Sequence, residues 1–223
     1  MNIVHSGIEV LTTVDKTTLY KQIERAARTC YKSEDKITDD SCVAMAKSLV
    51  KRQHLAMLEH ASVTVKFVCD RGVSHEIVRH RVASYAQEST RYCNYGNEKF
   101  GSEITVIDLA TGFKYDMNKE SDRKKWEIWN NAMMAAESFY FQMLDAGATP
   151  QEARSVLPSS TKTEIIVTMN LREWIHFFNL RALGTTGAPH PQMEEVALLA
   201  LKSFAEAMPE VFGPMYEEFQ QEA

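Results

Sequence analysis

A short run of cationic side chains in the first half of the sequence is the first feature that could do chemistry. Arg79, His80 and Arg81 are consecutive, Arg91 follows ten residues later, and Glu88 is the only acid among them. This leaves a local surplus of positive charge in a chain whose net charge is -5. Planar guanidinium groups bind phosphate oxygens through two parallel hydrogen bonds, so the run predicts a local anion site. A solvated basic strip that pairs with nearby carboxylates would explain the same residues.

Histidines around this run are candidate zinc ligands. His54, His60, His75 and His80 are close in sequence, and His75 with Glu76 resembles the start of a zincin helix. A zincin helix needs two histidines four residues apart, whereas His75 and His80 are five apart and diverge by roughly 140° around a helix. We therefore expect no metal site, and a zinc hydrolase is the weaker alternative.

Other reactive groups give weaker patterns. Ser84 and Ser89 lack the G-x-S-x-G turn of a serine hydrolase, and Cys93 beside Arg91 is interpreted as an inert thiol. The four cysteines form no C-x-x-C pair, so reduced thiols are expected. The nine glycines form neither a G-x-G-x-x-G nor a Walker loop, so side chains would have to anchor any nucleotide.

Composition limits the class of protein. The 223 residues are 44% hydrophobic and 25% charged, which excludes a collagen, a coiled-coil rod and a disordered tail. The acidic total argues against a general nucleic-acid binder. No apolar run approaches the ~20 residues that span a bilayer, and the first residues lack a secretory leader, so we expect no membrane association and a cytoplasmic protein. We expect one domain over residues 1–223.

Hydrophobic periodicity predicts the elements that must position these groups. Alternating residues predict a strand over 62–69, and β-branched residues predict another over 164–169. Helical spacing is found over 19–31, 41–51, 73–80, 121–144, 171–183 and 193–208. Strands and helices do not alternate regularly, which favours an α+β fold: a central, mostly antiparallel sheet flanked by helices.

One expected helix carries an unusual polar stripe. Residues 171–183 are nearly apolar all round, yet Arg172, His176 and Asn179 fall at i, i+4 and i+7 on one face. Polar groups on a buried helix must be paired or solvated. The stripe is either bonded to neighbouring loops or faces a ligand.

The order of residues after the cationic run carries a resemblance to a known family. Arg79-His80-Arg81, with the trailing Ser84, Gln87, Ser89, Arg91 and Tyr92, is similar to the RHR signature of flavin-dependent thymidylate synthases. Further segments agree in order: His54 with Leu58-Glu59-His60, the segment 153–158, Asn170-Leu171-Arg172, Asn179-Leu180-Arg181, and His190. The resemblance covers about residues 1–210.

The resemblance implies an activity and its cofactors. Members of this family methylate dUMP to dTMP, with 5,10-methylenetetrahydrofolate as the one-carbon donor and with FAD, reduced by NADPH, as the reductant. They use no enzyme nucleophile. They are homotetramers whose active sites form at subunit interfaces, and their fold is that of the thymidylate synthase-complementing proteins.

The resemblance also implies which residues of this chain form the site. Arg181 is expected to ionise the uracil at N3 and so activate C5. The expected dUMP-binding residues are Glu76, Arg79, Gln87, Glu88, Ser89, Thr90, Arg91, Arg154 and Arg181. The expected FAD-binding residues are Ala56, Arg79, His80, Arg81, Gln87, Asn170, Leu171, Arg172, His176 and His190.

Several positions depart from the family pattern, among them Met57, where Pro is common, and the loop from Gly184 to Pro189, which is longer than in some members. Ala56 stands where a hydroxyl residue is usual, Glu76 where Gln is common, and His176 where some members have Asn. A function from another class also uses the same residues: a nucleotide- or RNA-binding module that employs the strip from Arg79 to Arg91 without redox chemistry.

Overall fold

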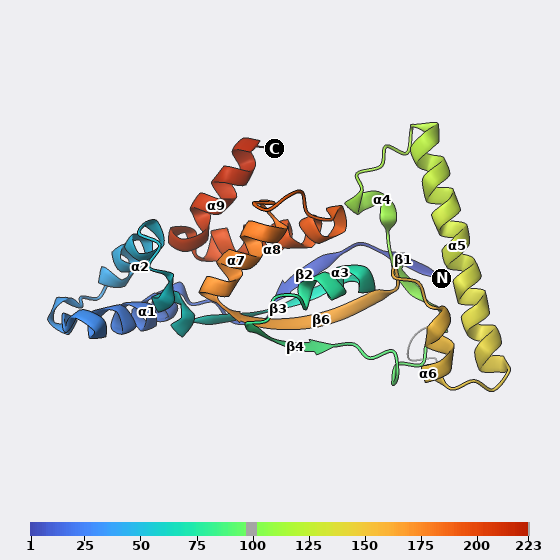
Figure 1. Ribbon diagram of the computed structural model, residues 1–223, viewed down its shortest axis with the longest axis horizontal. Coiled ribbons are helices and arrows are strands. Elements are labelled where there is room, and N and C mark those ends of the chain that lie inside the picture. The colour runs from blue at the N-terminus through green and yellow to red at the C-terminus, as the bar shows by residue number, and fades with distance from the viewer. Residues whose placement is uncertain (97–101, 223) are drawn as a thin grey trace. The chain divides into compact units, whose positions relative to one another are not determined.

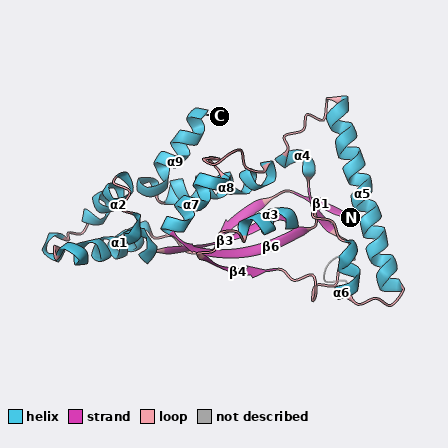
Figure 2. Ribbon diagram, viewed as in Figure 1, coloured by secondary structure: helices cyan, strands magenta, loops and turns pink. Residues whose placement is uncertain are grey.

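Two long strands arise where buried and partly exposed residues alternate. In β3 (Ser62–Asp70), Val63, Val65, Phe67 and Cys69 are fully buried, and β6 (Lys162–Asn170) has the same alternation. These strands form the centre of a four-stranded antiparallel sheet in the order β2-β3-β6-β4, whose strands are labelled in Figure 1. Figure 2 shows the strands in magenta. The outer strands are β2 (Gly7–Val10) and β4 (Ala83–Gln87).

The computed structural model describes residues 1–96 and 102–222. The chain divides into two compact units. Unit 1 consists of residues 1–7, 67–79 and 86–165, and unit 2 consists of residues 8–66, 80–85 and 166–223. Strands β3, β4 and β6 each contribute residues to both units. The expectation of one domain over residues 1–223 stays a prediction.

Unit 2 is held together by an aromatic core. Its helices are α1 (Lys16–Tyr31), α2 (Ser41–Lys51), α7 (Leu171–Arg181), α8 (Pro191–Ala207) and α9 (Pro209–Glu222) (Figure 1). Trp174 and Phe178 of α7 stack at a ring separation of 5.7 Å, and both contact Phe204 of α8. Phe212 of α9 lies 5.1 Å from Phe204. A 3-10 helix, η2 (Leu55–His60), packs against α7 and carries Ala56.

Unit 1 is built around one long helix, α5 (Glu120–Asp145), which packs against α6 (Pro150–Ala153) (Figure 1). Met133 and Tyr140 of α5 pack with Tyr95, Ile104 and Val106 in its core. The remaining elements of this unit are α3 (Arg71–Ile77), α4 (Leu109–Gly112), the 3-10 helix η4 (Arg154–Val156), and the parallel pair of β1 (Asn2–Val4) and β5 (Thr105–Ile107).

The helix α5 ends where the sequence predicts. Two residues after its last one, Gly147 has a φ of +90°, a conformation that favours glycine. Thr149 and Glu152 then form a reciprocal capping box that starts α6.

The α+β expectation is confirmed, and each long element expected from the sequence is present within a few residues of its expected ends. Strand β4 and helix α9 are among the elements that were not expected. Strand β4 was missed because its exposure pattern has no buried face, and α9 because Pro209, Gly213 and Pro214 suggest a loop. Within the part of the chain that the structure describes, no helix is long and apolar enough to cross a membrane.

Candidate functional site

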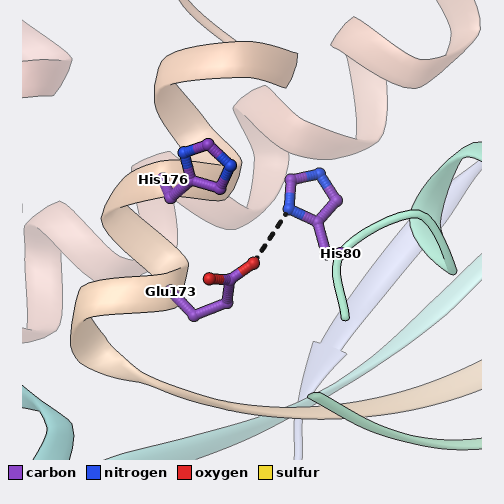
Figure 3. A group of neighbouring side chains, drawn as sticks. All are labelled: His80, Glu173 and His176. Carbon is purple, nitrogen blue, oxygen red and sulfur yellow. Dashed lines mark hydrogen bonds and ion pairs between the residues drawn. The ribbon is translucent and has the colours of Figure 1, made fainter. Parts of the chain in front are cut away.

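A buried histidine lies at the centre of the site in unit 2. The side chain of His80 is enclosed between Phe177, at a ring separation of 4.9 Å, and His176, at 5.6 Å. Its Nδ1 lies 3.2 Å from Oε1 of Glu173, and the Nε–H of Arg181 donates to its Nε2 at 3.4 Å. Figure 3 shows Glu173 and His176 projecting from α7 toward His80.

Burial determines the charge state of this histidine. The loss of solvent, the charge of Arg181 and the neighbouring His176 together lower the pKa of His80 to about 4. Burial also raises the pKa of Glu173 above its usual value. His80 is therefore a neutral imidazole at neutral pH.

The start of α7 positions three of the predicted residues. Asn170 is the N-cap of this helix, and its side-chain oxygen accepts a hydrogen bond of 2.9 Å from the backbone N–H of Glu173. The cap fixes the first turn, so that Arg172 and His176, four residues apart, share a face. Leu171, the residue before Arg172, has a fully buried side chain, and its N–H donates to the carbonyl of Ala61.

Two cavities of unit 2 lie along this helix. The first has a volume of about 540 Å³ and is lined by residues of α1, α2 and η2, by Gln53 and His54 just before η2, and by Arg172. Ala56 and Tyr31 are among them. The second, also about 540 Å³, is lined by Leu55, Glu59, Val82, Asn170, Arg172, Glu173, Ile175, His176 and Asn179. The polar stripe of α7 therefore faces a cavity, which favours the ligand interpretation of Arg172, His176 and Asn179.

Arg172 lines both cavities and is oriented by a carboxylate. Its Nη1 lies 2.5 Å from Oε1 of Glu59, and both side chains are about half exposed. An ion pair this exposed contributes little stability, so the guanidinium can exchange its partner for a ligand. Arg81 and His190 are exposed in the same unit, and His190 is the N-cap of α8.

Five of the predicted substrate residues of unit 1 are consecutive: Gln87 ends β4, and Glu88 to Arg91 follow it. Gln87 donates through Nε2 to the hydroxyls of Ser74, at 2.9 Å, and Thr163, at 3.2 Å. Glu88 forms an ion pair of 3.2 Å with Lys162. Lys162 also pairs with Glu164 at 2.7 Å, so one lysine is shared between two carboxylates.

The next residues form a tight turn. The Ser89 hydroxyl accepts from the N–H of Arg91 at 3.3 Å, Thr90 is buried, and Arg91 itself is exposed. Tyr92 lies beneath the Arg91 guanidinium, whose carbon is 5.4 Å from the ring centre.

The other predicted residues of unit 1 are more isolated. Arg79 and Arg154 are exposed, and Glu76 on α3 is partly buried. Their assigned contacts, like that of Leu171, stay predictions.

Among the residues that the structure describes, one group has metal-ligand chemistry: His80, Glu173 and His176, whose ligand atoms lie within 4.8 Å of one another. Two imidazoles and a carboxylate are zinc ligands in other proteins. However, Nε2 of His80 already accepts from the Arg181 cation, which would repel a dication beside the ring. The described histidine group is also not the sequence-derived set of His54, His60, His75 and His80.

Glu173 and Glu59 contact predicted site residues but were given no role from the sequence, although Glu59 belongs to the segment Leu58-Glu59-His60 that carries the family resemblance. Glu173 is 93 residues away in sequence from its partner His80, and Glu59 is 113 residues away from its partner Arg172. For Glu173 a signal was present, because it lies next to Arg172 and three residues before His176 on a stripe already recognised as unusual.

Comparison with known proteins finds related sequences that share one family name. Relatives named flavin-dependent thymidylate synthase are found in Geobacter sulfurreducens, 36% identical over 70% of this chain and 66% of the relative, and in Pyrococcus abyssi, 37% identical over 67% and 58%. The chain thus spans somewhat less than two thirds of the length of these relatives.

A solved structure supports the fold. The crystal structure of a UMP/dUMP methylase, PolB from Streptomyces cacaoi bound with 5-Br dUMP, matches with a TM-score of 0.79 at 22% identity, over 96% of both chains. Residues 12–210 match the family described as thymidylate synthase complementing protein. Since this match spans most of the sequence, the chain belongs to the thymidylate synthase complementing protein family.

Proposed function

We propose that this protein is a flavin-dependent thymidylate synthase. It converts dUMP to dTMP with 5,10-methylenetetrahydrofolate as the one-carbon donor and with FAD and NADPH as the source of reducing equivalents. The observation that carries the proposal is that Arg172, Asn170, His176 and Ala56, four of the residues assigned to the cofactor, line two cavities that share Arg172.

The residues of unit 2 fit a flavin. The two cavities, each about 540 Å³, offer apolar walls from Leu55 and Ile175 beside the polar groups of Asn170 and His176. Arg172 supplies a cation that can release Glu59 for an anionic cofactor group. Bound FAD would supply hydride transfer. Ala56 offers only its backbone, since it has no hydroxyl.

The arginines assigned to the substrate have the chemistry that a nucleotide requires. Arg91 and Arg154 present exposed guanidinium groups that can bind a nucleotide phosphate, with the Ser89 hydroxyl beside Arg91. Arg181 would pair with the uracil and stabilise the negative charge that develops on N3 and O4. This charge makes C5 nucleophilic, so the one-carbon unit is attacked without an enzyme nucleophile.

The assembly and location belong to the same proposal. We expect a homotetramer in which residues of different subunits complete each site, acting in the cytoplasm. No nucleic acid is expected as a partner.

Purified protein, reconstituted with FAD, should be yellow and should convert dUMP to dTMP when given methylenetetrahydrofolate and NADPH. Omission of each component in turn is the control, and each omission should abolish product. Protein that forms no dTMP with every component present contradicts the proposal. A colourless protein that takes up no FAD and retains RNA would favour the RNA-binding alternative.

A further inference from the structure

His80 contacts a group of opposite character at each ring nitrogen. Nδ1 lies 3.2 Å from a carboxylate oxygen of Glu173, and Nε2 lies 3.4 Å from Nε of Arg181. The side chain is only 2% exposed, so water does not compete for either nitrogen. The three residues therefore form a continuous chain of carboxylate, imidazole and guanidinium.

The chemistry of the two partners fixes the imidazole proton. A guanidinium has only donors, so Nε2 must be the unprotonated acceptor. A neutral ring then carries its proton on Nδ1, from which it donates to Glu173. Burial and the nearby positive charges favour this neutral form, because they lower the pKa of His80 to about 4.

We propose that Glu173 is a positioning residue that acts through His80: it holds the ring as the Nδ1–H tautomer, so that Nε2 accepts from Arg181 and fixes the orientation of its guanidinium. This inference rests on the proposed function, in which Arg181 pairs with the uracil. A ring protonated at Nε2 would present a donor to a donor, and a flipped ring would present a C–H group. In either case the guanidinium would lose its acceptor.

The surroundings of His80 are built to keep the ring in place. The Tyr85 hydroxyl donates to the backbone carbonyl of His80, and Phe177 packs against the ring at a tilt of 58°. Glu173 is itself fixed, because its backbone N–H is bonded to the Asn170 cap. The carboxylate therefore meets the ring from a rigid helix end.

The first test reads the proton directly and does not depend on activity. Nitrogen-15 spectra of histidine-labelled protein distinguish the Nδ1–H tautomer, the Nε2–H tautomer and the charged ring. The His80 signal is identified by its loss in His80→Gln. We expect the neutral Nδ1–H tautomer at pH 7, and either other form overturns the proposal even if the enzyme makes dTMP.

The second test separates positioning from folding. Glu173→Gln keeps an oxygen that can accept from Nδ1–H, so turnover should stay within about threefold of the parent. Glu173→Met removes the acceptor at similar volume, and kcat should fall about tenfold. Flavin content and the KM for dUMP should change little, because a misaligned Arg181 weakens binding of the transition state and not of the substrate. Glu206→Gln, which removes an exposed carboxylate of α8, is the matched control.

A double-mutant cycle completes the test. If Glu173 acts through the ring, Glu173→Met should lower kcat no further in a His80→Gln background. Independent effects that multiply overturn the proposal, as does equal turnover in Glu173→Gln and Glu173→Met. Stoichiometric zinc on the parent protein that is lost in Glu173→Met would also overturn it, because the ring would then ligate a metal.

Discussion

At the scale of single residues, the site depends on how guanidinium groups are held. Arg181 meets a buried neutral imidazole, whereas Arg172 meets an exposed carboxylate at 2.5 Å. The first contact orients the cation without cancelling its charge. The second cancels the charge until a ligand displaces Glu59. In the proposed function the two arginines have different tasks: Arg181 stabilises a transition state, and Arg172 binds a cofactor.

Replacement of Arg181 by lysine tests the first task. Arg181→Lys keeps the positive charge but loses the planar fork and the Nε–H donor to His80, so turnover should fall by roughly 10- to 100-fold. Flavin content, measured by absorbance, should stay close to that of the parent. Equal turnover in the variant and the parent would remove Arg181 from the mechanism.

The depressed pKa of His80 predicts a dependence of stability on pH. The unfolded chain binds this proton near pH 6.5 and the folded protein near pH 4. Stability is therefore fully present above pH 6.5 and is lost as the pH falls toward 4, by about 2 kcal/mol at pH 5. The groups in contact with the ring are the carboxylate of Glu173, the guanidinium of Arg181, the imidazole of His176 and the apolar ring of Phe177.

Urea unfolding at pH 7 and pH 5 checks this expectation. In His80→Gln the loss of unfolding free energy between the two pH values should be smaller than in the parent by that amount. The same loss in both proteins would mean that the pKa of His80 is equal in the folded and unfolded states.

At the scale of elements, α7 joins the core to the site. Its buried face packs Trp174 and Phe178 against Phe204 of α8, and its polar face lines the second cavity. The rotation of this helix is therefore set by aromatic packing. A change in that packing should therefore rotate α7 and displace the polar side chains that line the cavity.

Truncation of Phe204 measures the strength of this packing. Phe204→Ala should lower the free energy of unfolding by about 3–5 kcal/mol, because its ring is buried among Trp174, Phe178 and Phe212. The exposed Leu199 of the same helix is the matched control, and Leu199→Ala should cost about 0.5 kcal/mol or less. Equal losses of stability in the two variants, read from urea unfolding, would contradict the role of the aromatic core.

Sequence patterns predict secondary-structure elements better than they predict contacts between elements. The alternation in β3 and β6 and the helical spacing of α5 and α7 are local, so their elements could be predicted. Strand β4 could not, because its place in the sheet comes from pairing with β6 and not from a buried face of its own. The contact of Glu173 with His80 could not be predicted either, since no pattern links two residues 93 positions apart.

At the scale of the whole molecule, the predicted residues divide between the two units. Ala56, His80, Arg172 and Arg181 belong to unit 2, and the turn that contains Arg91 belongs to unit 1. In the proposed function, residues of different subunits complete each site. The oligomeric state is therefore a direct test of this arrangement.

Light scattering of the purified protein should give the mass of a tetramer. Four chains of 25.4 kDa amount to about 100 kDa. The measurement should be repeated over a range of protein concentrations, with and without FAD. A particle of 25.4 kDa that nevertheless makes dTMP would show that one chain forms a complete site.

The regular alternation of β6 also constrains how this gene can diverge. Thr163, Ile165, Val167 and Met169 are buried, while the even-numbered positions end in Asn170, which starts α7. A codon inserted or deleted within β6 would exchange the buried and exposed positions of the strand residues that follow it. Descendants of this gene should therefore accumulate substitutions in β6 while its length stays invariant, with insertions confined to surface loops.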